Sequence, residues 1–149
     1  MVDELQNWLT PLMMRVGPAE RSKLARTVAQ EVRRSQQQRI LAQRNPDGSA
    51  YAPRKKRDLR GKAGRIKRKA KMFTKLRTAR FLKAQGNATA ATISFASRIS
   101  RIARVHQEGL RDRPGRAAPD VQYAKRELLG LTDAERERIR DLVLQRLAD

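Results

Sequence analysis

Apolar residues recur at helical spacing in several stretches of the chain, separated by polar segments rich in turn-forming residues. The longest such stretch runs from residue 19 to about 44, and its apolar positions are Leu24, Val28, Val32, Ile40 and Leu41. Arg and Gln dominate the other faces, including the run RRSQQQR. This pattern predicts one amphipathic helix, whose second half is solvated or packed on a neighbour.

The clearest helix is predicted near the end of the chain, in LTDAERERIRDLVLQRL. Thr132 and Glu135 have the spacing of a capping box, in which each side chain bonds the other's backbone N–H. The apolar stripe that follows comprises Ile139, Leu142, Val143 and Leu147. We therefore expect this helix to begin at Thr132 and to bury that stripe.

Two shorter stretches also follow a helical period. Residues 3–16 do so, with Pro11 marking either a kink or the start of a second helix. The other helix is predicted through Ile99, Ile102, Val105 and His106. It is expected to end at Gly109, because glycine suits a helix C-terminus.

Between these helices the period changes to two. ARFLKA and AATISFAS flank QGNAT, which predicts an antiparallel β-hairpin turning near Gly86 and Asn87. VQYAKRELLG is expected to form a short strand or an ordered connector. The elements together predict an α+β fold: several amphipathic helices, a small antiparallel β-hairpin or sheet and a long basic extended segment, in one domain spanning 1–149.

The basic segment interrupts this order. NPDGSAYAP, at 45–53, is dense in turn formers and predicts a loop, and from Arg54 to Lys71 there are too few large apolar residues to bury. We therefore expect 45–71 to be a basic loop or arm within the domain. Helix is expected to return in KAKMFTKL, where Met72, Phe73 and Leu76 share a face.

Positive charge is concentrated in the middle of the chain. The net charge is +20, and 19 of the 35 Lys and Arg residues lie between Arg33 and Lys83. Such a field attracts nucleic acid, acidic protein surfaces or anionic membranes. A membrane partner is disfavoured because the basic segment lacks a face of bulky apolar residues, and no apolar run is long enough to span a bilayer. No secretory signal is recognisable, so a soluble intracellular protein is expected.

Little in the sequence indicates catalysis. There is no cysteine, and the single histidine, His106, falls on the apolar face of its helix, where a hydrogen-bonded packing role is favoured. RGKAGR lacks the spacing and the final Lys-Ser/Thr of a phosphate-binding loop. The acidic residues lie mainly three or four positions from arginines on helices, as on solvated faces. The sequence predicts no enzyme, no cofactor and no metal site.

Three interpretations of the basic segment stay open at this point: a phosphate-binding arm, a solvated flexible arm, or an arm that orders against acidic protein neighbours. Its candidate contact residues are Arg54, Lys55, Lys56, Arg57, Arg60, Lys62, Arg65, Lys67, Arg68, Lys69 and Lys71. Because no aromatic residue lies among them, any nucleic-acid contact is expected to be with the backbone and without sequence specificity. The expected apolar anchors of the arm are Met72, Phe73, Leu76, Phe81 and Leu82.

Four segments, in the same order, resemble the tail completion proteins, or virion morphogenesis proteins, of contractile-tailed temperate phages. These segments are SQQQRILAQRNPDGSAYAPR, GRIKRKAKMFTKLRTARFL, IARVHQEGL and YAKRELLGLTDAERERI. Family members often carry Tyr-Pro-x-Arg-Pro where this chain has Tyr123 to Glu127, with Ala124 and Glu127 in place of the prolines.

The resemblance implies a structural role late in tail assembly, at the head-proximal end of the tail. It implies a homo-oligomeric ring, commonly sixfold, that meets tail tube, terminator and head connector proteins in the virion neck, after assembly in the host cytoplasm. Genomic DNA would pass through such a ring. For 54–71 it favours docking on protein over contact with DNA, and the alternative is a non-specific nucleic-acid-binding protein that uses the same segment.

Overall fold

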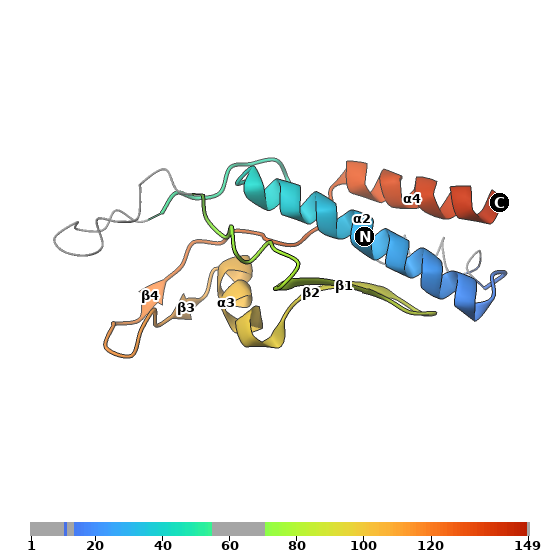
Figure 1. Cartoon of the computed structure of the whole chain (residues 1–149). Helices are drawn as coiled ribbons and strands as arrows, with labels where there is room; N and C mark the ends of the chain where they lie inside the picture. The colour runs from blue at the N-terminus through green and yellow to red at the C-terminus, as the bar shows by residue number, and fades with distance from the viewer. Residues whose placement is uncertain (1–10, 12–13, 55–70, 149) are drawn as a thin grey trace.

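Helix α2 (Pro18–Leu41) runs along most of the structure, a computed structural model that describes residues 11, 14–54 and 71–148. Helix α4 (Asp133–Ala148) lies antiparallel beside it (Figure 1). The hairpin of β1 (Leu82–Gly86) and β2 (Ala91–Phe95) packs on another side of α2, and α3 (Ser97–Glu108) follows the hairpin. The α+β fold expected from the sequence is confirmed.

The first half of α2 packs as the sequence predicts, and the second half does not. Leu24 is buried against Ile139 and Val143 of α4, with Val28 and Val32 beside them, which confirms the predicted stripe. The second half, expected to be solvated or to meet a neighbour, instead buries Gln36, Arg39 and Ile40 within the chain. That prediction was wrong because the buried polar side chains find hydrogen-bond partners on distant segments.

The β1–β2 hairpin turns where the sequence predicts. Asn87 Oδ1 accepts hydrogen bonds from the backbone N–H groups of Thr89 and Ala90, which fixes the turn between the strands. Gly86 is required for close packing on α2, because a Cβ placed there would lie 2.3 Å from the backbone nitrogen of Arg26. Ala25 and Ala29, both buried on α2, allow the same close approach.

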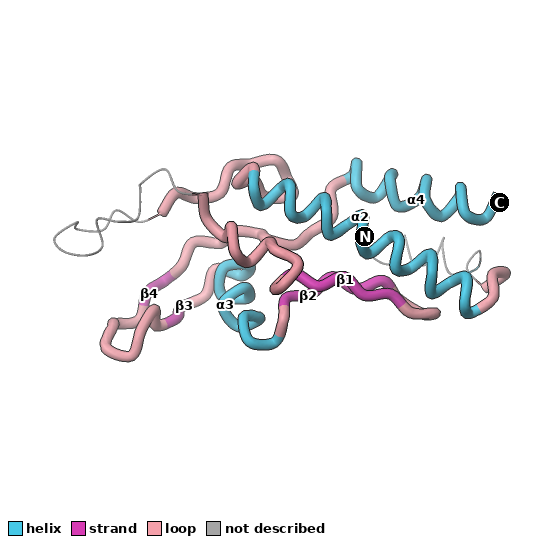
Figure 2. The backbone as a smooth tube through the Cα atoms, in the orientation of Figure 1, coloured by secondary structure: helices cyan, strands magenta, loops and turns pink. Residues whose placement is uncertain are grey.

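The predicted helix before Gly109 is α3, and Gly109 adopts the left-handed conformation of a helix C-terminus, with φ 66°. Beyond it the sequence predicts a short strand or an ordered connector in VQYAKRELLG, and a strand does form at Val121–Gln122. The structure adds a second two-stranded sheet there, of β3 (Arg111–Asp112) and β4 (Val121–Gln122), seen at the end of the molecule away from α4 (Figure 2). Two-residue strands are too short to leave an alternating pattern in the sequence.

The helix predicted in KAKMFTKL is wrong for the residues that the structure describes. Residues 72–77 form consecutive turns, and Phe73 has a left-handed φ of 64°. Gln43 accounts for the difference, because its side chain accepts a hydrogen bond from the Met72 N–H at 2.8 Å and donates one to the Met72 carbonyl at 2.9 Å. The backbone is tied to the end of α2 instead of to its own next turn.

Within 14–54 and 71–148, buried apolar residues form two clusters. One lies between α2 and α4 around Leu24, and the other comprises Ile40, Tyr51, Ala103 and Leu128. The predicted capping box of α4 is confirmed: Thr132 N–H donates to Glu135 at 2.8 Å and Glu135 N–H donates to Thr132 at 3.1 Å. The helix predicted over 3–16 falls largely outside the described residues.

Candidate functional site at the base of the basic segment

The structure describes only the two ends of the predicted contact segment, Arg54 and Lys71. The other candidate contact residues lie outside the described residues: Lys55, Lys56, Arg57, Arg60, Lys62, Arg65, Lys67, Arg68 and Lys69. Both ends are exposed, and the Arg54 guanidinium donates a hydrogen bond to the Lys71 carbonyl at 3.4 Å. The two described ends of the segment therefore lie side by side.

Each end of the segment is held by a polar side chain from elsewhere in the chain. On the returning side, Gln43 holds Met72 through its two hydrogen bonds. On the leaving side, the buried Arg126 guanidinium donates to the carbonyls of Ala52 at 2.8 Å and Pro53 at 3.0 Å. Burial, and then the positive charge of Arg54, lowers the pKa of Arg126. We call Gln43, Arg54 and Arg126 the base of the segment.

Aromatic rings pack behind this base in a continuous series. Tyr51 meets Phe73 edge to face with centroids 5.8 Å apart, Phe73 meets His106 at 4.8 Å, and His106 meets Tyr123 at 4.9 Å. The Tyr51 hydroxyl donates to the Glu127 carbonyl at 3.1 Å, and burial raises the pKa of Tyr51 to about 12. The rings thus join the loop before the segment to the turns after it.

His106 packs as the sequence suggests, between Phe73 and Tyr123, although its Nδ1 is buried without a hydrogen-bond partner among the described residues. Burial, with the nearby Arg126 charge, lowers its pKa, so the neutral ring is favoured. Within the same described part of the chain, no group of three His, Cys or acidic residues is placed to hold a metal ion.

The expected anchors of the arm lie in or next to the core. Met72, Phe73 and Leu76 are half-buried against the cluster of Ile40, Tyr51, Ala103 and Leu128. Leu82 is fully buried on β1. Phe81 is half-buried, and the Arg80 guanidinium lies 5.3 Å from its ring centroid.

Four separate segments of the sequence meet at or next to this base, and we call their contacts the junction. Gln43 of the first contacts Met72 of the second, and Phe73 contacts His106 of the third. The third reaches the fourth through Gln107, whose carboxamide oxygen accepts hydrogen bonds from the N–H groups of Leu128 and Leu129. These are the four segments that carry the family resemblance, so their residues maintain this junction.

Sequence reasoning from the residues missed Gln43 and Arg126 as holders of the segment. Nothing marks Gln43 in the sequence, because glutamine is common in this part of the chain and Gln43 belongs to no motif. Arg126 and Tyr123 carried a signal, since they match the Tyr and Arg of the family pattern Tyr-Pro-x-Arg-Pro. Where that pattern has its second proline, the Glu127 N–H donates to Asn45 Oδ1 at 2.9 Å, a bond that proline lacks the hydrogen to make.

Comparisons with known proteins agree with the family resemblance seen in the sequence. The model of the phage virion morphogenesis family matches residues 1–148. Tail completion protein S of Escherichia phage P2 is 39% identical to the chain over 140 residues, which cover 93% of this chain and 92% of that protein. No solved structure matches the chain. None of the helices that the structure describes is long and apolar enough to cross a membrane.

Proposed function

The chain belongs to the phage virion morphogenesis family, and from that premise we propose that it is a structural protein of the phage tail that acts in tail completion. It joins the head-proximal end of the tail to the head connector, as a subunit of a ring, sixfold in the commonest arrangement, around the DNA channel. It is placed in the virion neck after assembly in the host cytoplasm. The proposal assigns it no catalytic reaction and no cofactor.

The observation that supports this proposal most is the junction at the base of the basic segment. The half-buried Gln43 and the buried Arg126 hold the backbone at its two ends, and exposed Arg54 bonds Lys71, so the two ends lie side by side. The ends of the segment are thus fixed at one point of the folded chain, and its Lys and Arg residues suit an acidic surface on a neighbouring protein. We therefore assign 54–71 to docking on a tail or connector protein.

The anchors give this docking its rigidity. Phe73 and Leu82 are packed on the core. A partner that binds the segment is therefore connected rigidly to the folded part of the chain. Ordering of 55–70 on contact would join the subunit to its neighbours only where those neighbours are present.

The basic composition of 54–71 also supports a second function, non-specific binding of nucleic acid. The eleven Lys and Arg residues from Arg54 to Lys71 would also bind phosphodiester backbones without sequence preference. In that case the isolated protein would bind random duplex DNA through this segment, and loss of the segment would remove the binding.

Deleting the gene from a phage that carries it tests the main proposal. The expected result is filled heads and tails that accumulate separately in electron micrographs, and infectious particles that return when the chain is supplied. Normal particle yield without the chain would contradict the proposal. Electron microscopy of the purified protein, alone and with tails, tests the ring: solitary subunits in both samples would contradict it.

A further inference from the structure

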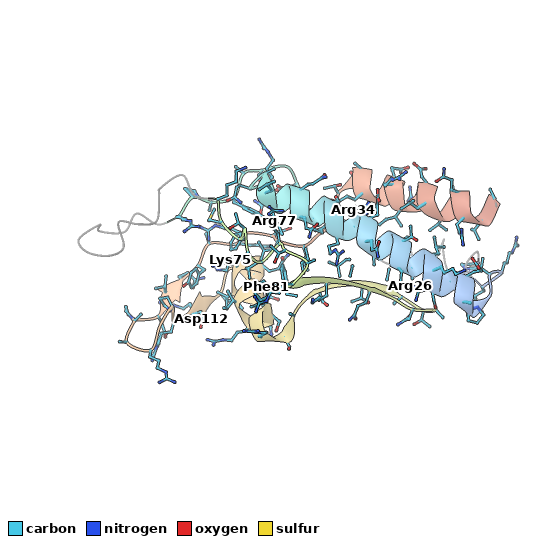
Figure 3. The ribbon with its side chains drawn as sticks, viewed as in Figure 1. Arg26, Arg34, Lys75, Arg77, Phe81 and Asp112 are labelled. Carbon is cyan, nitrogen blue, oxygen red and sulfur yellow. The ribbon has the colours of Figure 1, made fainter. Side chains whose placement is uncertain are left out.

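One side of α2 and the turns next to it carry cations without any acidic partner among the described residues. Arg26, Gln30, Arg33 and Gln37 are spaced i, i+4, i+7 and i+11, which places them on one face of α2 over about 16 Å of helix. Arg34 borders this face. Figure 3 shows Arg26 and Arg34 on α2, with Lys75 and Arg77 in the adjoining segment.

A direct contact joins the two parts of this surface. The Gln37 side chain donates a hydrogen bond to the Arg77 carbonyl at 2.8 Å, so the turns at 72–81 lie against α2 one helical turn from Arg33. We call the combined surface the α2 cationic face. Its members are Arg26, Arg33, Arg34, Lys75 and Arg77.

The acids of the chain are located elsewhere. No Asp or Glu occurs from residue 59 to 107, nor from 32 to 46. The two acids of α2, Glu20 and Glu31, form ion pairs with Arg146 and Arg138 of α4 on the opposite side. No member of the α2 cationic face forms an ion pair with any described residue, whereas the arginines of α4 do.

The guanidinium groups of Arg26 and Arg34 are the exposed donors of this face on α2. Arginine presents its donors as a fork that matches the oxygens of a phosphate group in pairs. Gln30 and Gln37 add neutral donors between the cations.

The face has the composition of a phosphate-binding surface more than that of a protein interface. Protein interfaces place apolar or aromatic side chains at their centre. The exposed large hydrophobic residues in the described part of the chain are Met14, Leu41, Ile102, Leu110 and Leu144, and only Leu41 lies on α2, at its end. Because no aromatic residue belongs to this face, contact is limited to the backbone.

We propose that the α2 cationic face binds the phosphodiester backbone of duplex DNA, without sequence specificity, and that it does so separately from the 54–71 segment. This assigns DNA contact to the folded part of the chain and leaves the basic loop for protein. The inference does not require the tail-completion role, because it is tested on the purified protein.

The test measures binding of the full chain to a short random-sequence duplex by fluorescence anisotropy over a range of salt concentrations. The test variant carries Arg26→Gln, Arg34→Gln and Arg77→Gln. The matched control carries Arg98→Gln, Arg111→Gln and Arg116→Gln, three exposed arginines that also lack ion pairs among described residues but lie on α3 and around β3–β4. Thermal unfolding by circular dichroism checks that both variants fold.

The slope of log affinity against log salt is expected to fall in magnitude by roughly 2 to 3 in the test variant, about 0.9 for each phosphate that is no longer neutralised. The control variant is expected to change it by less than about 1. If the slope falls equally in the two variants, the binding depends only on net charge, and the proposal is overturned. An unchanged slope in the test variant, with binding abolished by replacing 55–70, would overturn it as well.

Poly-L-glutamate serves as the probe for an acidic protein partner. The proposal expects its binding to change little between the test variant and the control variant. If the test variant loses affinity for polyglutamate and for duplex DNA to the same degree, the face does not select phosphodiesters and the assignment to DNA fails. Neither result bears on whether particles assemble, so failure here is distinguishable from failure of the tail-completion proposal.

Discussion

Arg39 and Glu135 form a buried ion pair at 2.9 Å that joins α2 to the first turn of α4. The same Glu135 carboxylate accepts the Thr132 N–H of the capping box. Gln36 and Ser35 of α2 also donate to it, so one carboxylate both begins α4 and fixes α4 against α2.

Removing one partner of this pair is expected to destabilise the fold strongly. Glu135→Ala should lower the free energy of unfolding by about 3–5 kcal/mol, because it leaves the Arg39 charge buried without its carboxylate. Thr132→Ala, which loses only the cap, should lower it by about 1 kcal/mol. Urea denaturation measures both, and equal effects of the two substitutions would show that Glu135 acts only as a cap.

The hairpin depends on the absence of a side chain at Gly86. Gly86→Ala should destabilise the protein by about 1–3 kcal/mol, because the new Cβ would overlap the backbone of α2 at Arg26. Gly115→Ala is the matched control, since a Cβ there has no atom within 4 Å. A Gly86→Ala protein as stable as the Gly115→Ala protein would contradict the close packing of β1 on α2.

Glu127 tests the connector where the family pattern has proline. Glu127→Pro removes the N–H that bonds Asn45 and should cost about 1–3 kcal/mol, because the Asn45 oxygen loses its partner. Glu127→Ala keeps the N–H and should cost far less. In Asn45→Ala the proline is expected to add little further loss, and fully additive losses would count against the bond.

The single histidine gives the protein a measurable pH dependence. Burial lowers the pKa of His106 below its usual 6.5, so the unfolded chain binds a proton at a higher pH than the folded chain does. The stability that the neutral ring contributes is therefore complete above about pH 6.5 and declines as the pH falls toward the lower folded pKa. Urea titrations between about pH 7 and pH 5 should show this decline.

His106→Phe keeps an aromatic ring between Phe73 and Tyr123 and is expected to reduce the decline. NMR titration of the ring protons gives the folded pKa directly, because there is no second histidine to overlap with it. A folded pKa at or above 6.5 would show that burial does not govern this group.

The sequence predicts the local elements of this fold better than it predicts their contacts. The capping box at Thr132, the turn at Asn87 and the helix end at Gly109 are each determined by residues close in sequence, and each is confirmed. The turns at 72–77 could not be predicted, because Gln43 holds Met72 from 29 positions away and overrides the helical pattern. Burial of Arg39 depends in the same way on Glu135.

The candidate site was predictable only in part. The basic composition of 54–71 identifies a contact segment, and its role in docking stays a prediction. Gln43 and Arg126 hold its ends through backbone groups that any residue supplies, so the residues they bind carry no mark in the sequence. Arg126 itself is marked only by the family pattern, and Gln43 is not marked at all. The α2 cationic face could not be predicted from neighbouring residues either, because it combines α2 with turns some forty residues away.

Replacement of 55–70 tests the central claim, that this segment docks the protein on its tail or connector partner. Arg54 and Lys71 stay in place, and residues between them are exchanged for a neutral Gly-Ser linker of equal length, with a shuffled sequence of unchanged composition as the control for charge. The measurement is the yield of infectious particles when each version is supplied to a phage that lacks the gene. The account predicts that the linker version folds but leaves heads and tails unjoined, and normal yield from it would contradict the account.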